Sequence, residues 1–298
     1  MMDINDLLSH TESLIKYVYW FKQEFDLEPK KEHIGSSIQW TDIEDRRHDF
    51  LKELVLTVVT WVYSKDKSRK IVEQRLKNVE GDIGNAYSFL TTQAFSKFRP
   101  GHPQGQFGEL LLFNFIQFFF QAVPLLRKQR ITTSKGHERF GADAVHYKKT
   151  ADNNLIILGE SKCYRSDYRF KAAFENSLNS IVDTVTNFNK ELDLYIYDDF
   201  IEPELEEVAL KYKSNELENV KFELVCLIAF NEKNNIEGKT EAEIKDSIKS
   251  IIENRCAKFD SKKFSAINKR ILKRINYIIF PIWELDELLE DFEKGVGI

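Results

Sequence analysis

The sequence predicts an α/β protein in which a mixed central sheet is flanked by helices and follows a helical N-terminal region. In residues 49–76, apolar side chains recur at the spacing of a helix. Beyond Pro124 the apolar pattern changes to alternation or to short apolar blocks, which are typical of strands. Because strand and helix patterns then alternate along the chain, we expect a sheet that is covered by helices.

The first hundred residues are expected to form a mainly helical region. The apolar positions of residues 49–76 that follow helical spacing are Phe50, Leu54, Val58, Trp61 and Val62. The sequence Arg-Pro-Gly-His-Pro at residues 99–103 is the strongest turn signal in the chain, and we place a domain boundary there. The prediction is a helical region over residues 1–100 and a sheet-containing core over residues 101–298.

A Phe-rich helix is expected directly after this turn. The uncharged stretch at residues 110–126 has the composition of a membrane span, but Asn114, Gln117 and Gln121 recur on one helical face and Pro124 closes it. A buried amphipathic helix with one polar stripe fits this pattern better than a membrane span does. We therefore expect no association with a membrane.

The rest of the core is expected to alternate between strands and helices. The predicted strands are residues 127–133, 142–147, 155–160, 222–230 and 275–282. The predicted helices are residues 168–189, 241–257 and 285–292.

Composition limits the class of protein. The chain has 298 residues with 43 Lys+Arg and 48 Asp+Glu, and its net charge of −5 argues against a generally basic coat for nucleic acid. Residues 127–171 are nonetheless locally basic, and residues 191–219 are strongly acidic. The three cysteines lie far apart with no zinc-ligand spacing, and the N-terminal segment is acidic where a signal peptide would be basic. We expect a cytoplasmic protein without disulfides or structural zinc.

Four residues are the candidates for a catalytic site: Glu109, Asp143, Glu160 and Lys162. The pattern Glu-x-Lys occurs elsewhere in the chain, but only at Glu160 does it end a buried apolar run. Residues two apart in a strand share a face, so Glu160 and Lys162 are expected to point the same way, with the carbonyl of Ser161 between them.

A hairpin between the strands at 142–147 and 155–160 would bring two acids together. A turn centred between residues 151 and 152 places Asp143 opposite Glu160, with their Cβ atoms about 4.5–5.5 Å apart. Two bare carboxylates at that distance repel, but they suit a shared divalent cation such as Mg²⁺, with Mn²⁺ expected to substitute. Lys162 can then orient or deprotonate a water and stabilise charge on a phosphate, and Glu109 can add a carboxylate directly or through water.

The segments that carry this constellation resemble a known family. They are Gly-Glu-Leu-Leu at 108–111, Phe-Gly-Ala-Asp-Ala-Val at 140–145 and Leu-Gly-Glu-Ser-Lys-Cys-Tyr at 158–164. Their order resembles the PD-(D/E)xK nuclease superfamily, and the phrases themselves are similar to HamA, the nuclease subunit of Hachiman antiphage defence systems. One departure is Ala142, which stands where the superfamily pattern has proline.

The resemblance implies a restriction-endonuclease-like core and Mg²⁺-dependent cleavage of DNA together with a partner helicase, HamB. It implies Asp143 and Glu160 as metal ligands and Lys162 as the catalytic lysine. From their positions beside this set, we also expect the carbonyl of Ser161 and the carboxylate of Glu109 as ligands. The side chains that we assign to DNA binding are Lys135, Arg139, Tyr164, Arg165 and Arg169. Basic and aromatic groups at the start of a helix, with no contact to DNA, would give the same pattern after Lys162.

Other functions remain open at the level of the sequence. The chain can be a catalytically silent subunit that holds DNA or a partner protein on a nuclease-derived fold, because fold alone does not fix function. It can also hydrolyse another phosphodiester, such as RNA. Glu109 can simply complement the dipole of its helix, and Asp143 can be a turn residue after Gly141. His146, which strand alternation turns away from Asp143, and Cys163 are expected to be structural.

Overall fold

The structure is a computed structural model that describes residues 4–9, 11–101, 103–127, 141–166, 170–195, 201–236 and 240–297. The strands of the described residues are β1 (Val18–Glu24), β2 (Glu32–Ile38), β3 (Val123–Leu126), β4 (Ala144–Lys149), β5 (Asn154–Tyr164), β6 (Val220–Glu232) and β7 (Ile275–Trp283). They form one seven-stranded sheet in the order β1-β2-β7-β6-β5-β4-β3. Strands β2, β7, β6 and β5 run parallel, and the two ends of the sheet are antiparallel. The mixed sheet that the sequence predicts is confirmed.

Helices surround this sheet. Those of the N-terminal region are α1 (Glu12–Ile15), α2 (Arg47–Leu56), α3 (Val58–Val62), α4 (Lys65–Asn78) and α5 (Ile83–Phe95). The others are α6 (Pro103–Phe120), α7 (Phe170–Tyr195), α8 (Pro203–Lys213), α9 (Glu241–Ala257), α10 (Lys269–Leu272) and α11 (Leu285–Gly295), with short 3₁₀ helices at Ile4–Leu7 and Ser261–Ala266. Side-chain oxygens cap several starts: Ser64 accepts from Lys67 N, Asp82 from Asn85 N, and Thr240 forms a capping box with Glu243.

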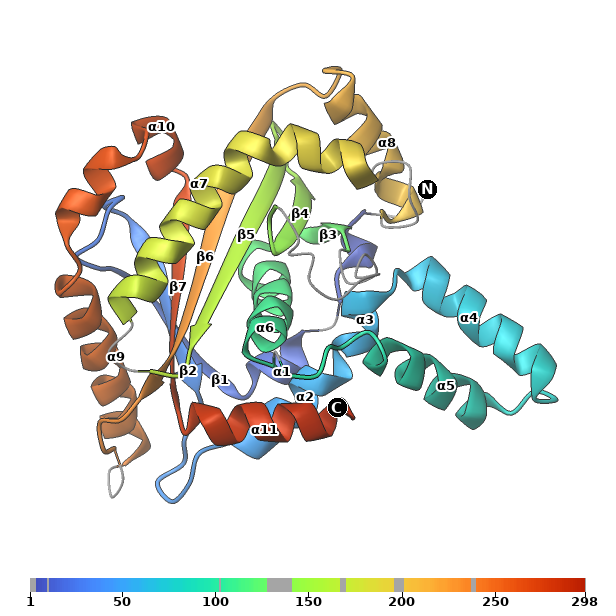
Figure 1. Ribbon diagram of the computed structural model, residues 1–298, viewed down its shortest axis with the longest axis horizontal. Helices are drawn as coiled ribbons and strands as arrows, with labels where there is room; N and C mark the ends of the chain where they lie inside the picture. The colour runs from blue at the N-terminus through green and yellow to red at the C-terminus, as the bar shows by residue number, and fades with distance from the viewer. Residues whose placement is uncertain are drawn as a thin grey trace.

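The core has two layers, one on each face of the sheet (Figure 1). Helices α2, α6 and α11 pack on one face, in a cluster that includes Ile157 of β5. Helices α7 and α9 pack on the other face, in a cluster that includes Ile156 and Leu158 of the same strand. Because successive residues of a strand point to opposite faces, β5 contributes to both layers. The position of a residue along β5 therefore decides which layer of helices its side chain meets.

The N-terminal region is helical in large part, but it also supplies two strands that the sequence analysis missed. Strands β1 and β2 form a hairpin, and β2 joins the central sheet by pairing with β7. The central sheet thus takes strands from both sides of residue 100. A division into two domains at that position stays a prediction.

The Phe-rich segment ends as a helix earlier than predicted. Helix α6 stops at Phe120, Gln121 adopts a left-handed backbone with φ of 52°, and the chain then forms β3. Pro124 is tolerated in β3 because this strand lies at the edge of the sheet. Two residues of the predicted polar stripe are buried, Asn114, which donates to Thr57 Oγ1 at 2.9 Å, and Gln117, whereas Gln121 follows the helix and is exposed. In the described parts of the chain, α6 and the other helices all fall short of the length and apolarity needed to cross a membrane.

Two predicted strand boundaries also differ. Strand β5 continues to Tyr164 because it pairs in parallel with β6 as far as Phe230. Glu160 and Lys162 therefore lie within the strand, and the prediction that they end it was wrong. The strand predicted at residues 127–133 lies mostly outside the described residues, and β3 precedes it.

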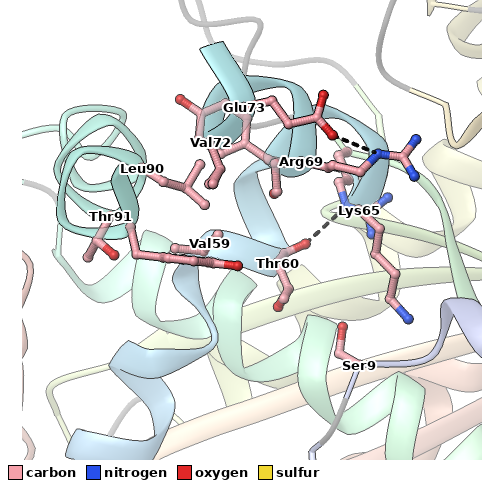
Figure 2. Close-up of a pocket in the computed structure, with 13 residues that line it drawn as sticks. Ser9, Val59, Thr60, Lys65, Arg69, Val72, Glu73, Leu90 and Thr91 are labelled. Atoms are coloured by element: carbon pink, nitrogen blue, oxygen red, sulfur yellow. Dashed lines mark hydrogen bonds and ion pairs between the residues drawn. The ribbon is translucent and has the colours of Figure 1, made fainter. Parts of the chain in front are cut away.

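Helices α4 and α5 form a hairpin that projects from the rest of the molecule (Figure 1). Its inner side meets α3, and a cavity lies where the three helices converge (Figure 2). This feature lies apart from the strands that carry the predicted site.

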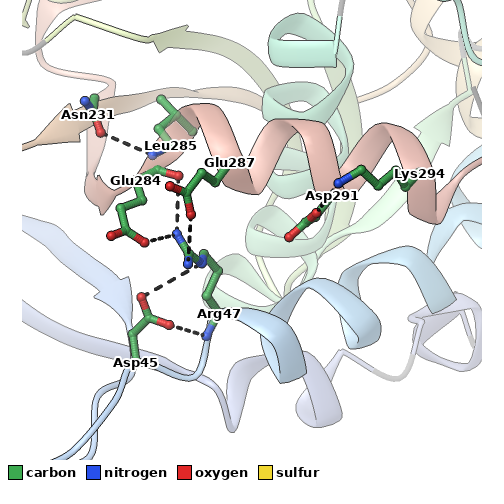
Figure 3. Close-up of polar contacts among 8 residues, drawn as sticks. All are labelled: Asp45, Arg47, Asn231, Glu284, Leu285, Glu287, Asp291 and Lys294. Atoms are coloured by element: carbon green, nitrogen blue, oxygen red, sulfur yellow. Dashed lines mark hydrogen bonds and ion pairs between the residues drawn. The ribbon is translucent and has the colours of Figure 1, made fainter.

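Arg47 joins the start of α2 to the start of α11 (Figure 3). Its Nη1 lies 2.5 Å from Glu284 Oε2, and its Nη2 lies 3.4 Å from Glu287 Oε2. Asn231 adds a cap, since its Oδ1 accepts from the Leu285 N–H at 3.2 Å. Arg47 is 22% exposed, whereas Glu284 and Glu287 are 58% and 65% exposed, so the contacts are shielded from solvent only on the arginine side.

Replacing Arg47 by alanine is expected to lower the free energy of unfolding by about 1–2 kcal/mol, since two carboxylates lose a half-buried cation. The matched control is Lys294→Ala, which removes a pair with Asp291 that is 73% exposed at the lysine and should contribute little to stability. Urea denaturation of both variants measures the difference. Equal effects of the two substitutions would contradict the bridging role of Arg47.

Candidate functional site

The β4–β5 hairpin brings the two predicted acids together. Its strands pair in the register that the sequence predicts, with Ala144 opposite Gly159. Asp143 directly precedes β4, and continuing the register would place it opposite Glu160; its N–H donates to the Gly159 carbonyl at 2.9 Å. The short turn between two apolar runs fixes this register, because a shift by one residue would turn every apolar side chain to the other face.

Ser161 holds the carboxylate of Asp143. Its backbone N–H and its hydroxyl both donate to Asp143 Oδ2, at 2.8 and 3.0 Å. The Ser161 side chain lies on the face that α6 covers, where a Cβ added at Gly108 would lie 3.2 Å from Ser161 Oγ. The glycine of the segment Gly-Glu-Leu-Leu therefore lets α6 approach the strand that carries the site.

Glu160 is buried, with 2% of its surface exposed, and it points to the opposite face, toward α7. The hydroxyl of Thr184 on α7 donates to Glu160 Oε1 at 2.8 Å. The other carboxylate oxygen, Oε2, lies 3.5 Å from Nζ of Lys162. The prediction that Glu160 and Lys162 share a face is confirmed, and each carboxylate oxygen of Glu160 has its own partner.

Burial, together with the negative charge of Asp143, raises the pKa of Glu160 to about 7. Lys162, Thr184 and Ser180 act in the opposite direction, but they do not outweigh burial. Burial and the Asp143 charge together disfavour the carboxylate more than the nearby Lys162 ammonium favours it. This is the electrostatic condition that a divalent cation would relieve.

Lys162 responds to the same charges. Burial by itself would lower the pKa of the Lys162 ammonium, but the carboxylates of Asp143 and Glu160 outweigh burial and raise it. The side chain is therefore a persistent cation at neutral pH. Of the two roles that the sequence leaves open for Lys162, stabilising negative charge fits this environment better than removing a proton from water.

The site offers two carboxylates to a metal. The part of the chain that the structure describes contains no group of three or more His, Cys, Asp or Glu side chains that could hold an ion. Mg²⁺ needs few protein carboxylates, because it keeps several waters and binds phosphate oxygens of a substrate. The pair Asp143 and Glu160 fits Mg²⁺ on this ground, and the carbonyl of Ser161 as a further ligand stays a prediction.

Glu109 lies on α6, next to Gly108, and is partly buried. It comes from the face of the sheet opposite to the one that Glu160 and Lys162 occupy. Its assignment as a direct or water-mediated ligand stays a prediction.

Comparison with protein families extends the resemblance seen in the three segments. The HamA family model matches residues 15–296. The chain belongs to the HamA family. The match includes β1, β2 and the helices of the N-terminal region, which the resemblance at residues 104–230 did not cover. A search of curated proteins found no match.

The residues that we assigned to DNA binding in this HamA chain fall into two groups. Tyr164 and Arg165 are described: the Tyr164 hydroxyl accepts from Asn176 Nδ2 at 2.7 Å, and Arg165 Nε lies 3.3 Å from Asp286 on α11. Lys135, Arg139 and Arg169 lie outside the described residues. Arg165 is about half exposed, so its guanidinium can still meet solvent or a ligand.

His146 and Cys163, which we expected to be structural, have pKa values that argue against a catalytic role. Burial lowers the pKa of His146 to about 3, so the ring is neutral, and it packs 5.5 Å from the Phe113 ring on α6. Burial raises the pKa of the Cys163 thiol to about 12, which removes it as a nucleophile at neutral pH.

The sequence analysis missed the partners that α7 supplies to Glu160. Ser180 and Thr184, four residues apart, form a short polar stripe on a largely apolar face of α7. This polar stripe was the available signal, because buried hydroxyl groups need a partner and an acid on the facing strand provides one.

Proposed function

We propose that this HamA chain is a Mg²⁺-dependent DNA nuclease that hydrolyses phosphodiester bonds and acts with a HamB-like helicase in antiphage defence. Membership of the HamA family supports the role in defence. The observation that carries the proposed activity is that Asp143, just before β4, is bonded to Ser161 of β5, which stands between Glu160 and Lys162, and that these two side chains lie 3.5 Å apart. Two acids, one of them buried, beside a persistent ammonium suit phosphodiester hydrolysis with a bound cation.

In this proposal, the two acids and the lysine have separate roles. A bound Mg²⁺ would polarise the phosphate and make a water acidic. Asp143, fixed by Ser161, and Glu160, fixed by Thr184, would hold the ion. Lys162 would place its ammonium beside the phosphate and stabilise the charge that develops there.

The proposed partner follows from charge. A chain with a net charge of −5 has little general attraction for DNA, because non-specific affinity grows with the number of phosphates that are neutralised. A helicase that delivers DNA to the site would compensate for this. The recognition of DNA and its unwinding would then belong to the partner.

Metal removal and Asp143→Asn test the proposed activity. Plasmid DNA is incubated with the chain and its helicase partner, with and without excess EDTA. We expect cleavage by the wild type to stop with EDTA and to fall by at least about 100-fold in Asp143→Asn, because one ligand loses its charge. Lys221→Ala, which removes an exposed strand lysine far from the acids, is the control. Equal cleavage by wild type and Asp143→Asn would end the proposal.

A catalytically silent binding subunit is the second candidate. It is favoured by the lack, within the described residues, of a third acid or histidine beside Asp143 and Glu160. Binding of Mn²⁺ or Ca²⁺ separates the two functions: a nuclease should show a thermal shift that depends on Asp143, and a silent module should show none. A matched RNA substrate in the cleavage assay distinguishes a ribonuclease.

Thr184 is expected to tune the metal affinity of the site. In Thr184→Val, Glu160 loses a buried hydrogen bond that lowers its pKa, so a cation must displace a more tightly held proton. We expect Mn²⁺ affinity at pH 7 to fall about tenfold, with Thr184→Ser close to wild type. Calorimetric titration measures both variants. Affinity that is unchanged in Thr184→Val would exclude this positioning role.

A further inference from the structure

A cavity of about 450 Å³ lies outside the candidate site, where α3, α4 and α5 converge (Figure 2). The loop before α1 and the residue after β3 complete its wall. Its lining residues come from none of the strands β4 and β5 or from α7, so it is separate from the acids and from Lys162. A volume of this size lies in the range of pockets that hold small organic ligands, about 300–1,000 Å³.

One side of the cavity is apolar. Val59 of α3, Val72 of α4 and Leu90 of α5 converge on it, as Figure 2 shows. Tyr87, which is 57% exposed, adds an aromatic ring to the lining. Three helices thus share one apolar surface that is open to a ligand, and a flat or aliphatic body could bury its surface there.

The other side is cationic. Lys65 and Arg69 of α4 lie together across the cavity from Leu90 and Thr91 in Figure 2, and Arg127 also contributes to the lining. The only acid that lines the cavity among the described residues is Glu73. The first turn of α4 begins at Lys65, so the positive end of that helix lies on this side as well.

Contacts within the protein hold these cations in place. Lys65 Nζ donates to the backbone carbonyl of Asp6, a neutral group that leaves the lysine charge uncompensated. Arg69 pairs with Asp66 at 2.7 Å and with Glu73 at 4.0 Å, so a phosphate would compete with these two carboxylates for its guanidinium (Figure 2). Arg127, which is buried, pairs with Glu202 at 2.6 Å and donates to the Thr60 carbonyl at 3.0 Å. The cationic side is therefore preorganised, which lowers the entropy cost of binding an anion.

We propose that this cavity binds a small organic phosphate of the size of a nucleoside monophosphate. Its aromatic body would lie between Val59, Leu90 and Tyr87, and its phosphate would meet Lys65 and Arg69. The hydroxyls of Thr60, Ser68 and Thr91, which also line the cavity, suit the polar edges of a base or a sugar. A purely apolar ligand would leave the cations unused, and a free phosphate would leave the apolar side empty.

Calorimetric titration of the full chain with AMP in the presence of EDTA tests this proposal. EDTA keeps the carboxylate site free of metal, so binding reports on the cavity. We expect AMP to bind, with Lys65→Ala combined with Arg69→Ala weakening it about tenfold or more, as loss of two charges on a phosphate implies. Both side chains are exposed, so the variant should fold. Lys77→Ala, a same-charge change on an exposed face of α4, is the control.

A second variant tests the apolar side. Tyr87→Ala should also weaken AMP binding, whereas Ile83→Ala, an equally exposed apolar residue of α5 that does not line the cavity, should not. Adenosine and inorganic phosphate serve as ligand controls, and each should bind more weakly than AMP. No detectable binding of AMP would overturn the proposal. Binding of adenosine as tightly as AMP would overturn it too. So would binding of AMP to the Lys65→Ala, Arg69→Ala double variant as tightly as to the wild type.

Discussion

Replacing Lys162 with alanine is expected to remove most of the DNA cleavage and to leave metal binding intact. The ammonium is 3.5 Å from Glu160 Oε2 and feels the charges of both acids, which keep it protonated. Its loss removes a cation from the place where charge develops on the phosphate. Loss of one such preorganised group reduces kcat by about 100- to 1,000-fold.

In Lys162→Ala, the rate of DNA cleavage should fall while the affinity for Mn²⁺ does not. Without the competing ammonium, Asp143 and Glu160 attract a divalent ion at least as strongly as before, so Mn²⁺ affinity should stay equal or rise. Cleavage of plasmid DNA with the helicase partner should fall in kcat with little change in KM. Wild-type turnover in Lys162→Ala, or a parallel loss of Mn²⁺ binding, would show that Lys162 does not act on the phosphate.

The register of the β4–β5 hairpin was predictable from the sequence because two apolar runs and a short turn fix it. The placement of Asp143 beside Glu160 follows from that register. The same reasoning failed for the ends of β5. A buried Glu160 and a partly buried Lys162 within a strand contradict the expected apolar pattern, and the pairing with β6 and the hydroxyl of Thr184 explain them.

Strand β2 was missed for a related reason. Its buried residues Gly35, Ser36 and Ser37 carry no hydrophobic signal. Gly35 lies under the ring of Phe21, where any Cβ would clash, and the Ser37 hydroxyl donates to the Pro281 carbonyl at 2.9 Å. These contacts join segments far apart in the sequence, so no local periodicity reveals them.

Glu160→Gln is expected to stabilise the metal-free protein above neutral pH. The pKa of Glu160 is about 7 in the folded chain and near its ordinary value of 4.5 when unfolded. Between these pH values the unfolded chain releases a proton that the folded chain keeps, so stability falls as the pH rises through this window. At pH 8 the full cost is present, and glutamine, which is neutral and keeps an oxygen for Thr184, removes it.

The gain in the free energy of unfolding at pH 8 should be on the order of 1–3 kcal/mol, and it should vanish near pH 4. Urea denaturation at both pH values in EDTA measures it, with Glu206→Gln on the exposed face of α8 as the control. Mn²⁺ should stabilise the wild type by mass action but not Glu160→Gln, because the variant loses a ligand. A variant that is less stable than wild type at pH 8 and is still stabilised by Mn²⁺ would mean that Glu160 is a structural acid. A variant that is more stable at pH 8 and is not stabilised by Mn²⁺ would mean that Glu160 is a metal ligand whose charge is unfavourable in the metal-free protein.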